Sequence, residues 1–123
     1  MGLTTVRDLS VSEAWDLLCQ NPASELIDVR TKEEWEALGC PDLSEAKKEV
    51  KKISLVLNPD YSLNPNYISE FEALGINKDS DVLFMCKAGG RSAKAAEMAT
   101  QMGYTKCYNV FEGFDGNLSL IHI

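Results

Sequence analysis

One short segment near the end of the chain combines groups that can act on an anion. It reads Cys86-Lys87-Ala88-Gly89-Gly90-Arg91-Ser92 and contains a thiol, two cations and two adjacent glycines. Consecutive glycines let successive backbone N–H groups face one concavity, and the positive end of a following helix adds to that field. Such a nest binds anions and lowers the pKa of a thiol placed in it. We therefore take Cys86 as a candidate nucleophile that is largely thiolate at neutral pH.

The sequence offers this thiol no obvious proton shuttle. The only histidine is His122, close to the end of the chain, so a paired Cys/His mechanism has little support. Chemistry that needs little acid–base help is favoured, in which a thiolate attacks an electrophilic anion and the nest holds the charged product. A cysteine at the end of a strand is usually a plain buried thiol, but the Gly-Gly-Arg-Ser context favours a reactive one.

The other cysteines give no sign of a metal or a disulfide framework. Cys19, Cys40 and Cys107 form no C-x-x-C pair with each other or with Cys86. This spacing argues against a zinc cage, and without a secretion signal it also argues against structural disulfides. We expect no cofactor, and we expect most of these thiols to be small buried or half-buried residues.

The elements that position the segment alternate between strands and helices. Apolar periodicity, the capping boxes Ser10/Glu13 and Thr31/Glu34, and turn residues predict helices at 12–19, 31–39, 65–75 and 92–102 and strands at 26–29, 53–57, 82–86 and 107–111. Continuous apolar strands between helices indicate an α/β fold with a mostly parallel sheet covered on both faces. Cys86 then follows a strand at the carboxyl edge of this sheet, where such folds bind ligands. Trp15 and Trp35 are expected to be core anchors.

Composition limits the classes of partner. The 123 residues are 45% hydrophobic and carry a net charge of −7, which fits a single domain at 1–123 and argues against binding nucleic acid or anionic lipid. Residues 1–10 show no secretory apolar run, and no stretch is long and apolar enough for a membrane span. We expect a soluble, cytoplasmic protein.

Two ordered motifs resemble those of single-domain rhodaneses, the rhodanese-like sulfurtransferases. The segment from Cys86 to Ser92 is similar to their C-R-x-G-x-R-S loop, and Ile27-Asp28-Val29-Arg30 followed by Glu33-Glu34-Trp35 resembles their D-V-R and E-E-[WY] signature. The segment from Tyr104 to Gly113 is similar to a third motif, so the resemblance spans nearly the whole chain. It implies a rhodanese-like three-layer α/β/α fold.

The resemblance also implies a reaction. The thiolate of Cys86 would take the outer sulfur of thiosulfate or a similar anionic donor, hold it as a persulfide, and pass it to a thiol or to cyanide. The N–H groups of the loop would cradle the persulfide, Arg91 would orient the donor and Lys87 would act as a point charge. This reading assigns persulfide or substrate binding to Lys87, Ala88, Gly89, Gly90, Arg91 and Ser92. Asp28 and Arg30 are expected to be structural.

The chain departs from the family pattern in two places. Residues 39–43 read Gly-Cys-Pro-Asp-Leu where many relatives have G-H-I-P-G-A. Residues 116–123 lack the usual W-x-x-x-G-L-P-like segment, so we expect an atypical tail that is truncated or altered. The position of the 39–43 turn in relatives gives the hypothesis that Cys40 is a resolving thiol or second sulfur carrier.

Three other functions stay open. A non-catalytic interaction domain of the same fold commonly loses the cysteine or the loop cation, and this chain keeps both. A sulfur-relay carrier would load slowly from thiosulfate and work with a partner protein. A phosphatase or arsenate reductase of this fold has C-x5-R, usually preceded by His, whereas here Arg91 is five positions after Cys86 and Met85 precedes it.

Overall fold

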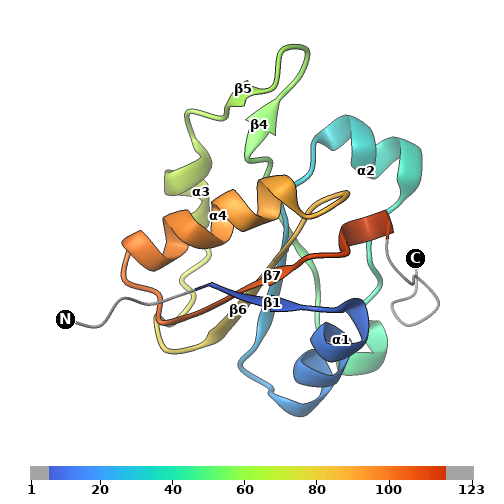
Figure 1. The fold of residues 1–123 in the computed structure, drawn as a ribbon, viewed down its shortest axis with the longest axis vertical. Helices are drawn as coiled ribbons and strands as arrows, with labels where there is room; N and C mark the ends of the chain where they lie inside the picture. The colour runs from blue at the N-terminus through green and yellow to red at the C-terminus, as the bar shows by residue number, and fades with distance from the viewer. Residues whose placement is uncertain (1–5, 116–123) are drawn as a thin grey trace.

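A parallel five-stranded sheet forms the centre of the molecule. The computed structural model describes residues 6–115, and the sheet order is β1-β7-β6-β2-β3 with every adjacent pair parallel (Figure 1). The strands are β1 (Arg7–Leu9), β2 (Glu25–Asp28), β3 (Lys51–Lys52), β6 (Asp81–Met85) and β7 (Lys106–Val110). The predicted α/β architecture is therefore confirmed. The atypical tail expected at 116–123 lies outside the described residues.

Helices cover both faces of this sheet. They are α1 (Val11–Gln20), α2 (Lys32–Leu38), α3 (Tyr67–Ala73) and α4 (Gly90–Gln101), with single 3₁₀ turns at Ser44–Ala46 and Gly113–Asp115. One apolar cluster joins α3 and α4 to the sheet through residues such as Phe71, Phe84 and Ala96, and a second joins α1 through Leu18 and Leu83. The molecule thus has the three layers that parallel sheets require.

Local sequence signals set the starts of the first two helices. Ser10 accepts a hydrogen bond from the backbone N–H of Glu13 while the Glu13 carboxylate accepts one from Ser10, and Thr31 and Glu34 repeat the arrangement. Both predicted capping boxes are therefore present. Between them, β2 runs straight into α2, so the side chains of the first turn of α2 lie beside the carboxyl edge of the sheet.

Strand β6 runs through the middle of the sheet and is buried along its whole length. It pairs with β2 on one side and β7 on the other, and its interior residues Val82, Leu83 and Phe84 have no exposed surface. Each such side chain contributes roughly 1.5–3 kcal/mol through burial. The buried end of β6 therefore fixes the position of Cys86, the residue that follows it.

Three predictions from the sequence were wrong in detail. The apolar run 53–57 is not one strand: β3 ends at Lys52, and Val56–Leu57 forms β4, which pairs antiparallel with β5 (Ser62–Leu63) in a separate hairpin. The helix expected from Pro65 starts at Tyr67, because the side chain of Asn64 accepts from the backbone of Asn66 before the helix begins. The expected core anchors Trp15 and Trp35 are both only half-buried: Trp15 packs at the edge of the apolar cluster that includes Leu18, and α2 buries none of its residues fully.

A buried ion pair closes the turn between β2 and α2. The Arg30 guanidinium binds the Asp28 carboxylate through Nη2 at 2.7 Å and Nε at 3.0 Å, and both side chains are fully buried. Nη2 also donates to the carbonyl oxygen of Gly39 at 2.8 Å, and Cζ lies 4.0 Å from the centre of the Phe114 ring. As expected, Asp28 and Arg30 act structurally here, and Arg30 connects three segments of the chain.

Replacing Arg30 by methionine should destabilise the fold strongly. Arg30→Met leaves the Asp28 carboxylate buried without its partner, which costs about 3–5 kcal/mol of unfolding free energy measured in urea. Arg7→Met is the matched control, because Arg7 is exposed in β1 and the same change there should cost less than about 0.5 kcal/mol. Equal losses in the two variants would contradict a structural role for the buried pair.

Candidate active site

The loop after β6 places Cys86 at the carboxyl edge of the sheet. Cys86 follows the last strand residue directly, and α4 begins at Gly90, two residues earlier than predicted. Gly89 adopts a φ of +101°, and a Cβ atom there would lie 2.4 Å from the carbonyl oxygen of Phe111. Because only glycine fits both the backbone conformation and this close approach, Gly89 fixes the sharp turn of the loop.

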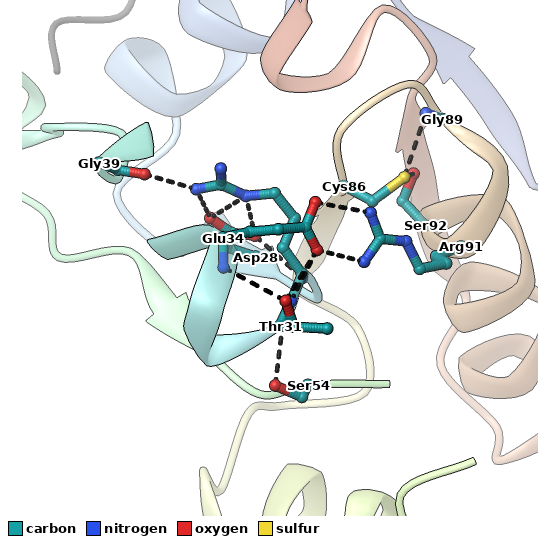
Figure 2. A network of polar contacts seen from close by, with 10 residues as sticks. Asp28, Thr31, Glu34, Gly39, Ser54, Cys86, Gly89, Arg91 and Ser92 are labelled. Atoms are coloured by element: carbon teal, nitrogen blue, oxygen red, sulfur yellow. Dashed lines mark hydrogen bonds and ion pairs between the residues drawn. The ribbon is translucent and has the colours of Figure 1, made fainter. Parts of the chain in front are cut away.

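The Cys86 sulfur is buried and lies among hydrogen-bonding groups. The residue is 1% exposed, the N–H of Gly89 donates to Sγ at 3.1 Å, and the Ser92 Oγ lies 3.3 Å from Sγ (Figure 2). Burial raises the pKa of this thiol, but the Ser92 hydroxyl and the backbone N–H groups of Ser92, Gly89 and Ala88 outweigh it. The pKa of Cys86 therefore lies below its ordinary value of 9.0.

The lowered pKa of Cys86 agrees with the amide nest expected from the sequence. The groups that lower it most are the Ser92 hydroxyl and the backbone N–H groups of Ser92, Gly89 and Ala88. Lys87 and Ala88 are exposed at the tip of the loop, whereas Gly89 and Ser92 are buried beneath it. The amide nest is thus the part of the predicted site that surrounds the sulfur most closely.

Arg91 forms a bidentate ion pair with a carboxylate from another helix. Its Nη1 lies 2.6 Å from Oε1 of Glu34 and its Nη2 lies 2.9 Å from Oε2, joining α4 to α2 beside Cys86 (Figure 2). The hydrogen bond from Arg91 lowers the pKa of Glu34 to about 2, helped by the Thr31 groups of the capping box. Arg91 also lies 5.8 Å from the ring of the exposed Tyr61.

The segment that follows β7 contacts the backbone of the active loop. The N–H of Phe114 donates to the carbonyl oxygen of Cys86 at 2.8 Å. A Cβ atom on Gly113 would lie 2.4 Å from the carbonyl oxygen of Lys87, and Gly113 has a φ of +63°. The absence of a side chain at Gly113 therefore lets this segment reach the backbone of the loop and hold it.

Sequence reasoning missed two polar residues of the site. Glu34 entered the analysis only as a capping residue and part of a motif, although a carboxylate in the first turn of α2 had to lie beside the loop. Asn109 is a polar residue in the otherwise apolar end of β7; it is 5% exposed and bonds to Ser92 and Gly89. The signal available in the sequence was a single amide side chain near the end of an apolar strand.

The remaining predictions concern Cys40, metal binding and membrane insertion. Cys40 follows the end of α2, is half-buried and carries a free thiol, so a role as a second sulfur carrier stays a prediction. Within residues 6–115, no cluster of three or more His, Cys, Asp or Glu side chains is arranged to hold a metal ion. In the same part of the chain, no helix has the length and apolar character of a membrane span.

Comparison with known proteins places the chain in a family. The Rhodanese-like domain family matches residues 10–118. An uncharacterised protein of Rickettsia conorii is 36% identical over 113 residues, which is 92% of this chain and 87% of the relative. The crystal structure of Rv0390 from M. tuberculosis has a TM-score of 0.82 at 39% identity, covering 92% of this chain and 83% of that one. The chain therefore belongs to the rhodanese-like domain family.

A further solved structure comes from a protein named for sulfur transfer. The solution structure of the polysulfide-sulfur transferase homodimer from Wolinella succinogenes has a TM-score of 0.71 at 29% identity. The similarity covers 89% of this chain and 71% of that chain.

Protonating Glu34 should weaken the link between α2 and α4. Because its folded pKa of about 2 lies below the ordinary 4.5, the pair stabilises the fold above about pH 5 and loses this effect as the pH falls toward 2. Glu34→Gln keeps the capping box but removes the charge. We expect it to cost on the order of 1 kcal/mol at pH 7 and to make the unfolding free energy less dependent on pH between 5 and 2.

Urea titrations at several pH values measure this difference. Glu33→Gln is the control, because Glu33 is the neighbouring exposed carboxylate on the same helix. If native protein and Glu34→Gln lost stability in parallel as the pH fell, the ion pair with Arg91 would not contribute to the fold.

Proposed function

We propose that this protein is a thiosulfate-type sulfurtransferase that carries a sulfane sulfur as a persulfide on Cys86. The observation that carries the proposal is the position of the Cys86 sulfur, at the carboxyl edge of the sheet with the Gly89 N–H at 3.1 Å and a lowered pKa. Membership of the rhodanese-like domain family supports it. So does the name of the W. succinogenes relative, a polysulfide-sulfur transferase.

The reaction needs no external oxidant. The Cys86 thiolate attacks the outer sulfur of thiosulfate, a new S–S bond forms, and the old S–S bond breaks with its electron pair leaving on sulfite. An acceptor thiolate or cyanide then attacks the outer sulfur of the persulfide, and the Cys86 thiolate is the leaving group. Sulfite and the thiolate are both stable anions, so neither step needs a general acid.

The backbone N–H groups of the loop would stabilise the negative charge of a persulfide. The N–H groups of the loop lie in a buried, low-dielectric site where hydrogen bonds to an anion are strong. Lys87 is exposed at the tip of the loop and would add positive charge near an incoming anionic donor. Arg91 is already bound by Glu34, so much of its charge is neutralised. In the proposed reaction this pair would hold α2 and α4 together beside the donor.

The acceptor side of the reaction fits a thiol. In the proposed persulfide the inner sulfur stays buried at Cys86, and an acceptor thiolate would attack the outer sulfur. We propose a cytoplasmic thiol as the usual acceptor and, as a variant of the same chemistry, a partner protein of a sulfur relay whose own cysteine collects the sulfur.

Removing the thiol should abolish turnover. We expect native protein to convert thiosulfate and cyanide to thiocyanate, and Cys86→Ser to lose at least about 10³-fold in rate, because the hydroxyl is a far weaker nucleophile at neutral pH. Cys19→Ser is the control, since Cys19 is exposed on α1, and it should keep native activity. Circular dichroism and thermal melting confirm that each variant is folded. A native protein that forms neither thiocyanate nor a persulfide would favour a non-catalytic domain.

The reactivity of Cys86 should rise with pH earlier than that of an ordinary thiol. Because the pKa of Cys86 in the folded protein is lowered from 9.0, its alkylation by iodoacetamide should reach half of its maximal rate below pH 9. The alkylation of Cys86 in urea-unfolded protein provides the reference. A midpoint in the folded protein at or above that of the unfolded chain would mean that burial outweighs the hydrogen bonds to the sulfur.

A further inference from the structure

A chain of hydrogen bonds runs from the edge strand β1 to the sulfur of Cys86. The Asn109 amide nitrogen donates to the carbonyl oxygen of Gly89 at 3.2 Å and to the Asp8 carboxylate at 3.4 Å. The Asn109 Oδ1 lies 2.5 Å from the Ser92 hydroxyl oxygen, which in turn lies 3.3 Å from the Cys86 sulfur. Asp8 and Asn109 are partners in the β1–β7 register, so this alignment is built into the sheet.

The partners of Asn109 decide which way its amide faces. A backbone carbonyl and a carboxylate can only accept hydrogen bonds, so the NH₂ group must face Gly89 and Asp8 and the Oδ1 must face Ser92. The Oδ1 can only accept, so the Ser92 hydroxyl must donate its proton to Asn109. A hydroxyl has one proton, and while Asn109 holds it, Ser92 offers the sulfur only a lone pair. The Ser92 hydroxyl therefore lowers the pKa of Cys86 only when it turns from Asn109 to the sulfur.

This direction has opposite effects on the two forms of Cys86. A neutral thiol can donate its S–H to the free lone pair of Ser92. A thiolate has no proton to give and needs the hydroxyl to turn toward it, which leaves the buried Oδ1 of Asn109 without its donor. Asn109 therefore competes with the thiolate for the single proton of Ser92.

The charged groups near the sulfur do not provide this competition. Arg91 faces the site from α4 with its charge balanced by Glu34 from α2, Lys87 lies at the tip of the loop, and Asp8 reaches the network only through Asn109. These charges stay the same whichever way the hydroxyl points. The orientation of Ser92 is thus a separate control on the sulfur.

We propose that Asn109 is a positioning residue that sets the direction of the Ser92 hydroxyl and so restrains ionisation of the empty Cys86. The persulfide carries its charge on the outer sulfur and leaves the inner sulfur neutral, so the hydroxyl can stay with Asn109 in that form. Asn109 then disfavours the bare thiolate relative to both the resting thiol and the loaded persulfide. This use rests on the proposed function, whereas the proton competition applies to any reaction of the thiolate.

A double-mutant cycle on the alkylation midpoint tests the inference. Iodoacetamide is neutral, and mass spectrometry of the Cys86 peptide follows the reaction in native protein, Asn109→Ala, Ser92→Ala and the double variant. We expect Asn109→Ala to lower the midpoint by about one pH unit when Ser92 is present, because the hydroxyl is then free to donate to the thiolate. It should not lower the midpoint in the Ser92→Ala background.

A purely structural Asn109 gives a different pattern. If it only held the carbonyl of Gly89, its loss would loosen the loop and leave the midpoint unchanged or raise it, by the same amount with or without Ser92, and that result would overturn the proposal. Thermal melting checks each fold, and Asn109→Val, which suits a buried strand, replaces the alanine variant if that variant does not fold. The measurement uses no sulfur donor, so a chain that transfers no sulfur still gives a valid answer.

Discussion

The burial of the Cys86 sulfur is the constraint on which the rest of the site depends. A thiolate that is 1% exposed has lost nearly all of its water, and burial alone raises its pKa. The fold compensates with fixed backbone donors, the N–H groups of Ser92, Gly89 and Ala88. Because these donors belong to the loop itself and to the first turn of α4, the reactivity of the thiol depends on how accurately that backbone is held.

Several independent contacts hold this backbone. Gly89 lies against the carbonyl of Phe111 and Gly113 lies against that of Lys87, at distances that exclude any side chain. Phe114 binds the carbonyl of Cys86, and its ring stacks on the buried Arg30. These contacts pack three segments together: the end of β7, the turn after β2 and the active loop. The three sequence motifs therefore meet in space although they lie far apart in the chain.

Short-range signals in the sequence predicted much of this arrangement, and long-range contacts account for the differences. Capping boxes and the apolar run of β6 depend on neighbours in sequence, so they were predictable, and the Gly-Gly pair pointed directly to the nest. The split of 53–57 depends on where this segment stops pairing with β2 and begins its own hairpin with β5. The partner of Arg91 depends on how α2 lies against α4. No local pattern specifies either contact. The sequence marks Asn109 only as a polar residue in an apolar strand, because its partners come from β1, the loop after β6 and α4.

Direct localisation of the transferred sulfur tests the central claim most sharply. Protein would be loaded with thiosulfate labelled in its outer sulfur and digested under non-reducing conditions. Mass spectrometry would then give the mass of each cysteine-containing peptide before and after cyanide is added. The account predicts one labelled sulfur on the peptide that contains Cys86, released by cyanide as labelled thiocyanate. A label found only on Cys19, Cys40 or Cys107, or none on any peptide of folded protein, would contradict it.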